Sequence, residues 1–346
     1  MNKISFIIPV YNVDTNDLIQ CIDSITSQKL MEYEILIIND GSEDKSIDII
    51  CKELSNNNKN IKYYYQNNSG SAVARNTGIN NSSGDYIMFV DADDMLVDGF
   101  IEKLYKIIDE SNKFDIIVFD YSYWNLSNED IQSLKKPGNY TSKKEDIMSN
   151  ILYYPNKIND FMFGSIWAKL FSRSFLSNNE ISFGPELRKA QDRRFMLDVV
   201  YHSNSILYYP VYAYKYRTNN NSICHKMNYN MIDYYKKLYI SLINFKNKYN
   251  IDNDVYKFLE YNIINELLPL SVFHINNKKK YYEKNKEFKK IYNDYELYYK
   301  TRKIKLHDVP SFKGKVKLLF FRYRLTFMIY LFYVNKQKKI MKKSFN

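Results

Sequence analysis

Gly84-Asp-Tyr-Ile-Met-Phe-Val-Asp-Ala-Asp-Asp-Met-Leu96 is the stretch that decides how the rest of this chain is interpreted. Its centre, residues 87–90, is apolar and β-prone, which predicts a strand buried on both faces. Three carboxylates, Asp91, Asp93 and Asp94, follow that strand directly. Ligands of an open α/β sheet bind at the carboxyl ends of its strands, and clustered oxygen donors suit Mg²⁺ or Mn²⁺ that carries phosphates. Acidic pairs are also common in ordinary turns, so the neighbouring segments must decide.

Strands and helices are expected to alternate around this segment. The spacing of apolar residues predicts strands at 4–10, 33–39, 61–66, 85–90 and 115–121. It predicts helices at 14–29, 42–54, 71–81 and 98–110, the second of them capped by Ser42 or Asp44. This alternation indicates an α/β fold with a doubly wound, mostly parallel sheet, right-handed crossovers and flanking helices.

The pattern is less regular beyond residue 121. We expect a polar surface loop at 125–145, a helix at 188–201, and two short strands, 206–209 and 211–217, that close the far edge of the sheet. Residues 228–303 show helical spacing without any catalytic motif, which predicts a helical appendage.

Charge is distributed unevenly along the chain. The formal net charge of its 346 residues is +11, yet residues 1–100 contain 7 basic and 15 acidic residues. Residues 313–346 contain ten basic residues and no acidic one. A uniformly basic binder of nucleic acid is not built in this way, so nucleic acid is excluded as a partner.

The sequence predicts a cytoplasmic protein. Residues 4–10 are too short an apolar run for a signal peptide, and no stretch reaches the roughly 18 to 20 apolar residues that a membrane span needs. Cys21, Cys51 and Cys224 are widely spaced and form no metal pattern, which favours a reducing compartment and no disulfide. We expect the chain to be soluble or peripheral to a membrane.

Two further motifs lie at the ends of predicted elements. In Asn39-Asp40-Gly41-Ser42, the Asp40 carboxylate beside a flexible glycine is placed to accept a hydrogen bond from a base such as uracil, although Asp-Gly is also a common turn. Ser69-Gly70-Ser71 places free backbone amides at a helix start, where anions are favoured, and Arg75 adds a cation one turn later. Neither motif is specific by itself.

Taken together, the motifs resemble those of glycosyltransferase family 2, which comprises inverting enzymes with the GT-A fold. The segments that carry the resemblance are Ile7-Ile8-Pro9-Val10-Tyr11-Asn12, Asn39-Asp40-Gly41-Ser42, 70–78, Gly84-Asp85-Tyr86 and Asp91-Ala92-Asp93-Asp94. They occur in the family's order and spacing over roughly the first 100 residues. Their joint occurrence is far more specific than any one of them.

The resemblance implies roles for individual residues. Pro9, Tyr11 and Asp40 would line the nucleotide base pocket, and Arg75 would lie beside the base and phosphates. Asp91 and Asp93 would be the family's Asp-x-Asp, in which Asp93 binds Mn²⁺ or Mg²⁺ directly while Asp91 reaches the ribose or the metal shell. Asp94 would then be structural. A divalent ion that bridges both phosphates neutralises the charge that develops on the leaving nucleotide.

The second half of the chain would supply the catalytic base. Gln191-Asp192-Arg193-Arg194-Phe195 stands about where the family has its Glu-Asp pair, which makes Asp192 the base that deprotonates the acceptor hydroxyl. Gln191 replaces the usual Glu and removes a negative charge beside the base. An N-cap or a salt bridge to Arg188 or Arg194 is the alternative role for Asp192.

Three more residues receive roles from the resemblance. Trp167, in a segment that resembles the family's Trp-x-Lys-Leu-aromatic motif, would bind the acceptor sugar, with a buried core position as the alternative. Arg217 would contact the diphosphate from a loop that closes over the donor. His225 would complete the metal shell, unless it is simply an exposed histidine. Lys169 receives no role.

The tail at 313–346 alternates cations with aromatic residues. Residues 325–334 would form about 15 Å of helix, half of a bilayer's hydrocarbon thickness, which can lie in an interface but cannot cross it. This composition favours adsorption to an anionic membrane surface. A helix packed on the enzyme, followed by a disordered basic end, is the alternative.

The sequence therefore predicts a metal-dependent inverting glycosyltransferase of bacterial surface-polysaccharide type, peripheral on the inner face of the cell membrane. It would move a sugar from a nucleotide sugar, most simply a UDP-sugar, to a glycan or lipid-linked glycan. We expect a GT-A domain at 1–225, with a nucleotide-binding half at 1–100 and an acceptor half at 101–225, then a helical appendage at 226–312 and the basic tail. A binding module without turnover and a sugar nucleotidyltransferase are the alternatives; the latter usually carries a Gly-rich loop after its first strand, which this chain lacks.

Overall fold

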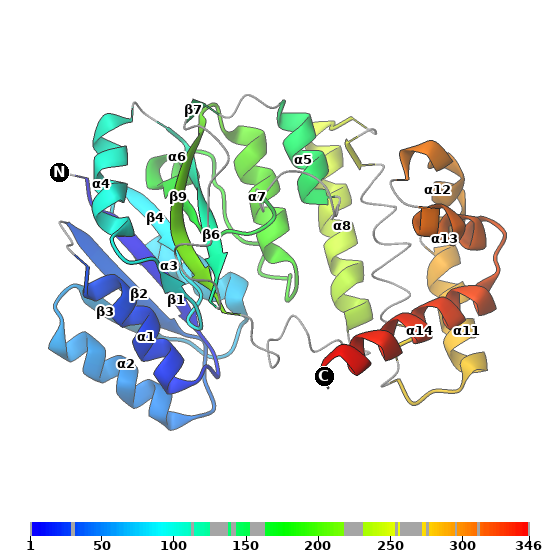
Figure 1. Cartoon of the computed structure of the whole chain (residues 1–346), viewed down its shortest axis with the longest axis horizontal. Coiled ribbons are helices and arrows are strands. Elements are labelled where there is room, and N and C mark those ends of the chain that lie inside the picture. Colours follow the sequence, from blue (N-terminus) through cyan, green and yellow to red (C-terminus); the bar gives the residue numbers. More distant parts are fainter. Residues whose placement is uncertain are drawn as a thin grey trace. The chain divides into compact units, whose positions relative to one another are not determined.

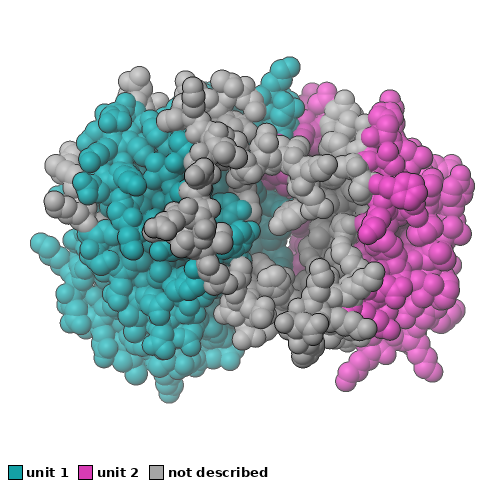
Figure 2. Space-filling view, in the orientation of Figure 1, with its two compact units in different colours: residues 1–147, 158–219 teal, residues 148–157, 220–346 magenta. Residues whose placement is uncertain are grey.

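The computed structural model describes residues 2–28, 32–111, 114–124, 138–139, 143–152, 163–217, 231–252, 255–256, 272–274, 277–294, 296–309 and 312–344. The chain forms two compact units (Figure 2). The first comprises residues 1–147 and 158–219, and the second comprises 148–157 and 220–346. The domain boundary predicted near residue 225 lies outside the described residues and stays a prediction.

The first unit is built on a mixed sheet (Figure 1). Within the described residues it has nine strands in the order β3-β2-β1-β4-β8-β6-β9-β5, with β7 paired to β9. The strands are β1 Ile4–Val10, β2 Tyr33–Asn39, β3 Ile61–Tyr65, β4 Tyr86–Phe89, β5 Met95–Leu96, β6 Ile116–Tyr123, β7 Gly138–Asn139, β8 Lys169–Ser172 and β9 Ile206–Tyr216. The flanking helices are α1 Thr15–Thr26, α2 Lys45–Asn57, α3 Ser71–Asn81, α4 Phe100–Glu110, α6 Arg173–Asn178 and α7 Gln191–His202. A further helix, α5 Lys144–Leu152, begins in the stretch assigned to the first unit and ends in the stretch assigned to the second.

The parallel half of the sheet is the part that the sequence predicted well. β3, β2, β1 and β4 are all parallel, and the central residues of β1, β2 and β4 are almost completely buried. Asp14 caps α1 and Asp44 caps α2, each by accepting a hydrogen bond from a backbone N–H two residues later. Asp44, and not Ser42, is thus the cap of the second helix.

The other half adds antiparallel strand pairs to the mostly parallel sheet that was expected. β8 is antiparallel to both β4 and β6, and β9 is parallel to β6 but antiparallel to β5 and β7. Apolar pattern reveals that a segment is a strand but not its direction. The direction of each strand is set by the strands it pairs with, and apolar periodicity does not show these pairings.

One correction concerns β9, which was predicted as two short strands. It is one strand from Ile206 to Tyr216, with Pro210 in its middle. The register with β6 shifts between Phe119 and Asp120 and again between Asp120 and Tyr121. Proline cannot donate to a strand ladder, so this irregularity allows the strand to pass Pro210 without ending.

The second unit is helical in its described residues. Its elements there include α8 Met231–Tyr249, α11 Tyr281–Asp294, α12 Leu297–Lys303, a short 3₁₀ turn at Leu306–Asp308, α13 Phe312–Arg322 and α14 Thr326–Ser344. Ile329 and Tyr333 of α14 are buried, whereas Phe327 and Leu331 are exposed. Within the described ranges, none of the helices has the length and apolar character that crossing a membrane requires.

Candidate active site

The acidic segment lies directly after the central strand β4, as predicted, and Asp94 is its anchor. Asp94 is 1% exposed and accepts hydrogen bonds from the Tyr214 hydroxyl and the Arg217 backbone N–H, both at 2.7 Å. Burial, aided by Asp91, raises the pKa of the Asp94 carboxyl well above its usual range. These contacts join the segment to the end of β9 and fit the structural role given to Asp94.

The Arg217 side chain links the same acidic segment to helix α1. Its Nε donates to the carbonyl of Asp93 at 2.9 Å, and its guanidinium binds Asp17 of α1 at 2.8 Å and Gln20 at 3.0 Å. The guanidinium carbon also lies 3.8 Å from the centre of the Trp124 ring. A contact of Arg217 with a diphosphate stays a prediction, and it would require the side chain to exchange these partners.

Arg75 connects the acidic segment to α7. It is 5% exposed, and its two terminal nitrogens bind Asp91 Oδ1 at 2.8 Å and Asp192 Oδ1 at 3.1 Å. Its Nε is buried and has no hydrogen-bond partner among the described residues. One guanidinium thus binds two residues that are far apart in the sequence: Asp91 of the expected Asp-x-Asp, and Asp192, the expected base.

Asp192 stands in the first turn of α7, and α7 begins after Ala190 in the left-handed conformation. Burial raises the pKa of Asp192, while Arg75 opposes this rise and Asp91 adds to it. A carboxylate with a raised pKa beside a polar cluster has the character of a general base. Neighbouring Gln191 donates to the Ser71 hydroxyl at 2.7 Å, at the start of α3.

The donor set suits a hard divalent cation, although it is incomplete. Burial and the neighbouring Asp91 raise the pKa of Asp93 to about 6, and no other side chain in the described ranges donates to its carboxylate. A cation would relieve this crowding of negative charge. In the described part of the chain no cluster of three or more His, Cys, Asp or Glu residues is arranged to hold a metal. Phosphate oxygens would have to complete the coordination, as is usual for Mg²⁺.

Asp40 is a buried anchor of the predicted base pocket. It is 3% exposed, and its oxygens accept hydrogen bonds from the backbone N–H groups of Ser69 and Gly70 and from the Gln66 amide, each at 2.8 Å. The close approach requires Gly41, where φ is +70° and a Cβ would lie 2.7 Å from the backbone nitrogen of Asn68. Contact between Asp40 and a base stays a prediction.

The remaining predicted residues lie in different settings. Pro9 and Tyr11 are half-buried at the end of β1, beside the end of β2. Trp167 is 6% exposed and stacks on Tyr214 with ring centres 5.2 Å apart, so it fits the alternative of a core residue. Its contact with an acceptor stays a prediction. His225 lies outside the described residues.

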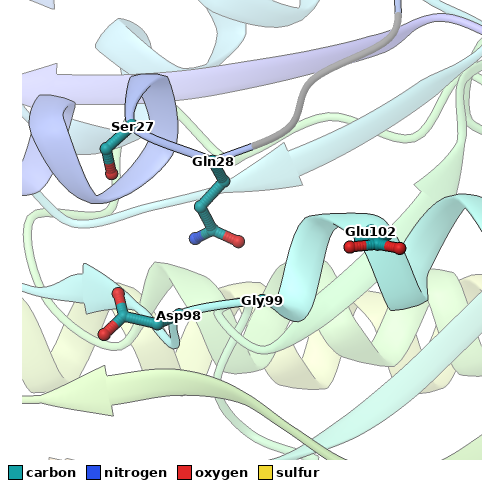
Figure 3. A pocket seen from close by; sticks show the side chains of 5 residues that line it. All are labelled: Ser27, Gln28, Asp98, Gly99 and Glu102. Atoms are coloured by element: carbon teal, nitrogen blue, oxygen red, sulfur yellow. The ribbon is translucent and has the colours of Figure 1, made fainter.

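A surface hollow of about 320 Å³ lies away from these residues. Ser27, Gln28, Asp98, Gly99 and Glu102 line it, between the end of α1 and the start of α4 (Figure 3). Gln28 donates there to the carbonyls of Ser24 and Val97 and accepts from the backbone N–H of Ile101. Its amide joins these elements, and none of the candidate site residues borders the hollow.

Comparison with known proteins decides the family. Residues 5–177, half of the chain, match the family model described as "Glycosyl transferase family 2". The chain belongs to glycosyltransferase family 2. It is therefore an enzyme of the glycosyltransferase class, and the fold is that of the family: the GT-A fold expected from the sequence is confirmed, with a helical region after it.

Individual relatives of this family 2 enzyme are more distant. It is 36% identical over 224 residues to the "Glycosyltransferase GlyA" of Streptococcus pneumoniae, a match that covers 64% of the chain but only 31% of the relative. It is 28% identical over 207 residues to the "Poly(ribitol-phosphate) beta-N-acetylglucosaminyltransferase TarP" of Staphylococcus aureus, which covers 59% of each protein. The chain thus spans about a third of GlyA.

Solved structures support the fold. The crystal structure of S. aureus TarS 1-349 in complex with UDP-GlcNAc superposes with a TM-score of 0.67 at 18% sequence identity, over 97% of this chain and 92% of TarS 1-349. At this level of identity the likeness concerns the fold alone. The superposition covers almost all of the chain, so the similarity in fold to TarS extends beyond residues 5–177, which the family model matches.

Sequence reasoning missed two features of the family 2 site. It placed Arg75 beside the nucleotide but did not foresee its bond to Asp192. It also gave no role to Lys169, which is buried at 2% exposure and whose charge acts on Asp192. A lysine within the apolar run 166–171 was the available signal, because a charged residue is rarely buried without a partner.

Proposed function

We propose that this chain is an inverting, metal-dependent glycosyltransferase that moves a sugar from a UDP-sugar to a hydroxyl of a cell-surface glycan or lipid-linked glycan. The observation that carries the proposal is the Arg75 guanidinium, which holds Asp91 at 2.8 Å and Asp192 at 3.1 Å. A donor-binding carboxylate and a base in one cluster are what a single displacement needs, since the acceptor must attack beside the bound donor.

Asp192 is the base in this proposal. It takes the proton of the acceptor hydroxyl while the acceptor oxygen forms its bond to the anomeric carbon. The bond from that carbon to the diphosphate breaks, and its electron pair remains on the phosphate oxygen. Attack opposite the leaving group inverts the configuration and needs no covalent enzyme intermediate. The raised pKa of Asp192, caused mainly by burial, increases its basicity.

Asp93, with Asp91 beside it, is the pair of side chains that would hold Mn²⁺ or Mg²⁺. Bound there, such an ion supplies charge neutralisation at the departing diphosphate. Asp94 and Arg217 hold the backbone of the acidic segment and thereby fix the direction of both carboxylates. Asp40 keeps the loop at 66–70 in place for the nucleotide base.

The donor and acceptor classes rest on the relatives. TarS was crystallised with UDP-GlcNAc, and TarP is named as an N-acetylglucosaminyltransferase acting on poly(ribitol-phosphate). We therefore propose UDP-GlcNAc as the first donor to test, and a surface glycan or polyol phosphate polymer as the acceptor class.

A cytoplasmic enzyme held at the inner membrane face is the proposed setting. The tail at 313–346 has ten basic residues and no acidic one, and Phe327, Met328 and Leu331 on α14 are 37–53% exposed. An interfacial helix with cations beside exposed apolar side chains suits an anionic leaflet, where a lipid-linked acceptor would lie.

The test is nucleotide release from a panel of UDP- and GDP-sugars with Mn²⁺, Mg²⁺ or EDTA. The wild type should release UDP from one UDP-sugar only with a divalent ion, and faster with an acceptor. Asp192→Asn should bind UDP as the wild type does but turn over about 100- to 1000-fold more slowly. Lys52→Met, an exposed change on α2, is the control.

Two outcomes would oppose the proposal in different ways. If calorimetry detects no nucleotide binding, the proposed function is wrong. If UDP binds tightly but no sugar is transferred to any acceptor, the alternative of a binding module without turnover is favoured.

A further inference from the structure

Asn76 of α3 binds a backbone segment that precedes the proposed base. Its Nδ2 donates to the carbonyl of Phe183 at 2.8 Å, and its Oδ1 accepts from the backbone N–H of Phe183 at 2.9 Å. Phe183 lies between α6 and α7, outside any helix or strand. One side-chain amide thus pairs with both backbone polar groups of this residue, as the hydrogen-bonded partner does in an antiparallel sheet.

The Phe183 side chain packs between two parts of the proposed site. Its ring is completely buried, stacks on Phe195 with ring centres 4.1 Å apart, and lies edge-on to Phe89 with ring centres 5.5 Å apart. Phe89 is the last residue of β4 and comes just before the segment that contains Asp91. Phe195 lies on α7 one turn after Asp192, on the same side of the helix. The Phe183 ring therefore lies between the strand that leads to Asp91 and the helix that carries Asp192.

Two consecutive residues of α3 contact this arrangement. Arg75 binds Asp91 and Asp192 directly, and its guanidinium carbon lies 5.6 Å from the centre of the Phe183 ring. Asn76 holds the backbone that carries the same ring. Because packed interiors deform little, the buried ring sets the spacing across which Arg75 reaches both carboxylates.

We propose that Asn76 is a positioning residue for the transfer reaction: by holding the Phe183 backbone, it fixes the ring that sets the spacing between Asp91 and Asp192. The inference rests on the proposed function, in which Asp192 is the base. A displacement of about 1 Å can lower a rate about 100-fold, because donor, acceptor and base must be aligned for the reaction.

The test compares two substitutions of Asn76 in the full-length chain. Asn76→Ala removes both hydrogen bonds, whereas Asn76→Asp keeps the acceptor for the Phe183 N–H and loses the donor to the carbonyl. Asn81→Ala is the matched control, because Asn81 is an exposed asparagine of the same helix whose amide donates to the Thr77 carbonyl one turn earlier. Thermal melting shows which variants are folded at the assay temperature, and Asn76→Asp serves if Asn76→Ala is not.

The rate and the binding of the nucleotide are measured separately. UDP release with Mn²⁺, first from UDP-GlcNAc and then from the other UDP-sugars, gives kcat, and calorimetry gives the Kd of UDP. We expect kcat to fall about 10- to 100-fold in Asn76→Ala and about tenfold in Asn76→Asp. The Kd of UDP should stay within about twofold of the wild-type value, because the proposed role concerns the alignment of the base. Asn81→Ala should match the wild type in both measurements.

A double substitution distinguishes a role in positioning the base from a general loss of packing. In a chain that already carries Asp192→Asn, the base is absent and its alignment no longer matters. Adding Asn76→Ala there should slow the residual UDP release by less than about threefold, because residues that act as a unit are not additive. A packing defect that weakens the whole site would instead multiply with the loss of the base.

Three results would overturn the inference: folded Asn76 variants with the wild-type kcat, a Kd of UDP that weakens as much as kcat falls, or a full multiplication of the two effects in the double variant. A wild type that releases UDP from no sugar overturns the proposed function, and this inference with it. An active wild type whose Asn76 variants behave normally overturns this inference alone.

Discussion

The Asp93 carboxylate carries negative charge that the described protein does not neutralise. Burial and Asp91 raise its pKa to about 6, so at neutral pH its ionised form opposes folding. We expect Asp93→Asn to raise the Tm of the metal-free protein by a few degrees, a change of about 1 kcal/mol. The same variant should lose the rise in Tm that Mn²⁺ with UDP gives the wild type.

The two halves of this prediction check each other in one melting experiment. Asp98→Asn, an exposed carboxylate nearby, should change neither the metal-free Tm nor the metal effect. If Mn²⁺ with UDP stabilised Asp93→Asn as much as the wild type, Asp93 would not be a metal ligand.

A substitution at Gln191 tests the charge balance at Asp192, the proposed base. Its amide donates to the Ser71 hydroxyl at 2.7 Å, a bond that a carboxylate can form only as an acceptor. Gln191→Glu restores the residue that the family usually has and adds a negative charge beside Asp192. The pKa of the base should rise, which moves the acid limb of kcat up by about one pH unit.

The measurement is the pH profile of kcat with saturating donor, compared with Gln20→Glu as a control of the same chemistry on α1. An acid limb at the wild-type position would show that the charge at residue 191 does not reach the base. A limb that moves down would contradict the sign of the argument.

At the residue scale, the sequence revealed groups that stand next to each other in the chain. The run from Asp91 to Asp94 was recognised because its three carboxylates follow one strand. The ion pairs by which Arg75 joins Asp91 to Asp192 were not recognised. Those two aspartates are about a hundred residues apart in the sequence, and the sequence does not show which carboxylate an arginine will bind. Lys169 was passed over because a single lysine in an apolar run has no pattern of its own.

At the scale of elements, Glu34 joins the strands of the parallel half. It is 1% exposed and accepts hydrogen bonds from the Ser5 hydroxyl, the Lys62 ammonium and the backbone N–H of Ser83. Burial alone would raise the pKa of Glu34, but these hydrogen bonds outweigh it and lower the pKa to about 2. Strand β2 is thereby connected to β1, to β3 and to the turn before β4.

This arrangement predicts a defined pH dependence of stability. A carboxyl whose folded pKa is lowered contributes fully above its unfolded pKa of about 4.3, and the contribution is lost as pH falls toward 2. We expect the wild type to lose about 2 kcal/mol over this window that Glu34→Gln does not lose. Urea unfolding at several pH values measures it.

Glu102→Gln is the control for Glu34→Gln, because Glu102 is more than half exposed and pairs only with Lys106 on its own helix among the interactions described. Equal pH dependence in the wild type and in Glu34→Gln would show that Glu34 does not couple the strands in this way.

Elements with a strong period were predictable, and those defined by their partners were not. Strands β1 and β2 and helix α3 have the bounds that were expected, because each has a clear apolar period or a clear start signal. Strand β8 was hidden in a longer apolar stretch and pairs with strands on both sides in the opposite direction. Strand direction depends on tertiary pairing, for which local sequence has no signal.

At the scale of the whole molecule, charge is divided between the two ends of the sequence. The first 100 residues carry a net negative charge, whereas all the charged residues among the last 34 are basic. An acidic donor site would repel an anionic membrane, and a basic tail would be attracted to it. The division therefore predicts that the tail, and not the catalytic sheet, makes the first contact with an anionic surface.

The last prediction is that α14 binds anionic vesicles through its exposed apolar face. Phe327 and Leu331 are one turn apart and are 53% and 37% exposed, so both can enter the interface without unfolding the unit. The double substitution Phe327→Ser with Leu331→Ser should weaken co-sedimentation with phosphatidylglycerol-containing vesicles about tenfold or more. Ile49→Ser, an equally exposed apolar change on α2, should leave it unchanged.

Binding of the wild type should fall as salt rises and be weak on neutral phosphatidylcholine, because the cations attract the leaflet before the apolar side chains enter it. If the double variant sedimented as the wild type does, or if the wild type ignored the anionic lipid, α14 would be a helix of the enzyme and not a membrane contact.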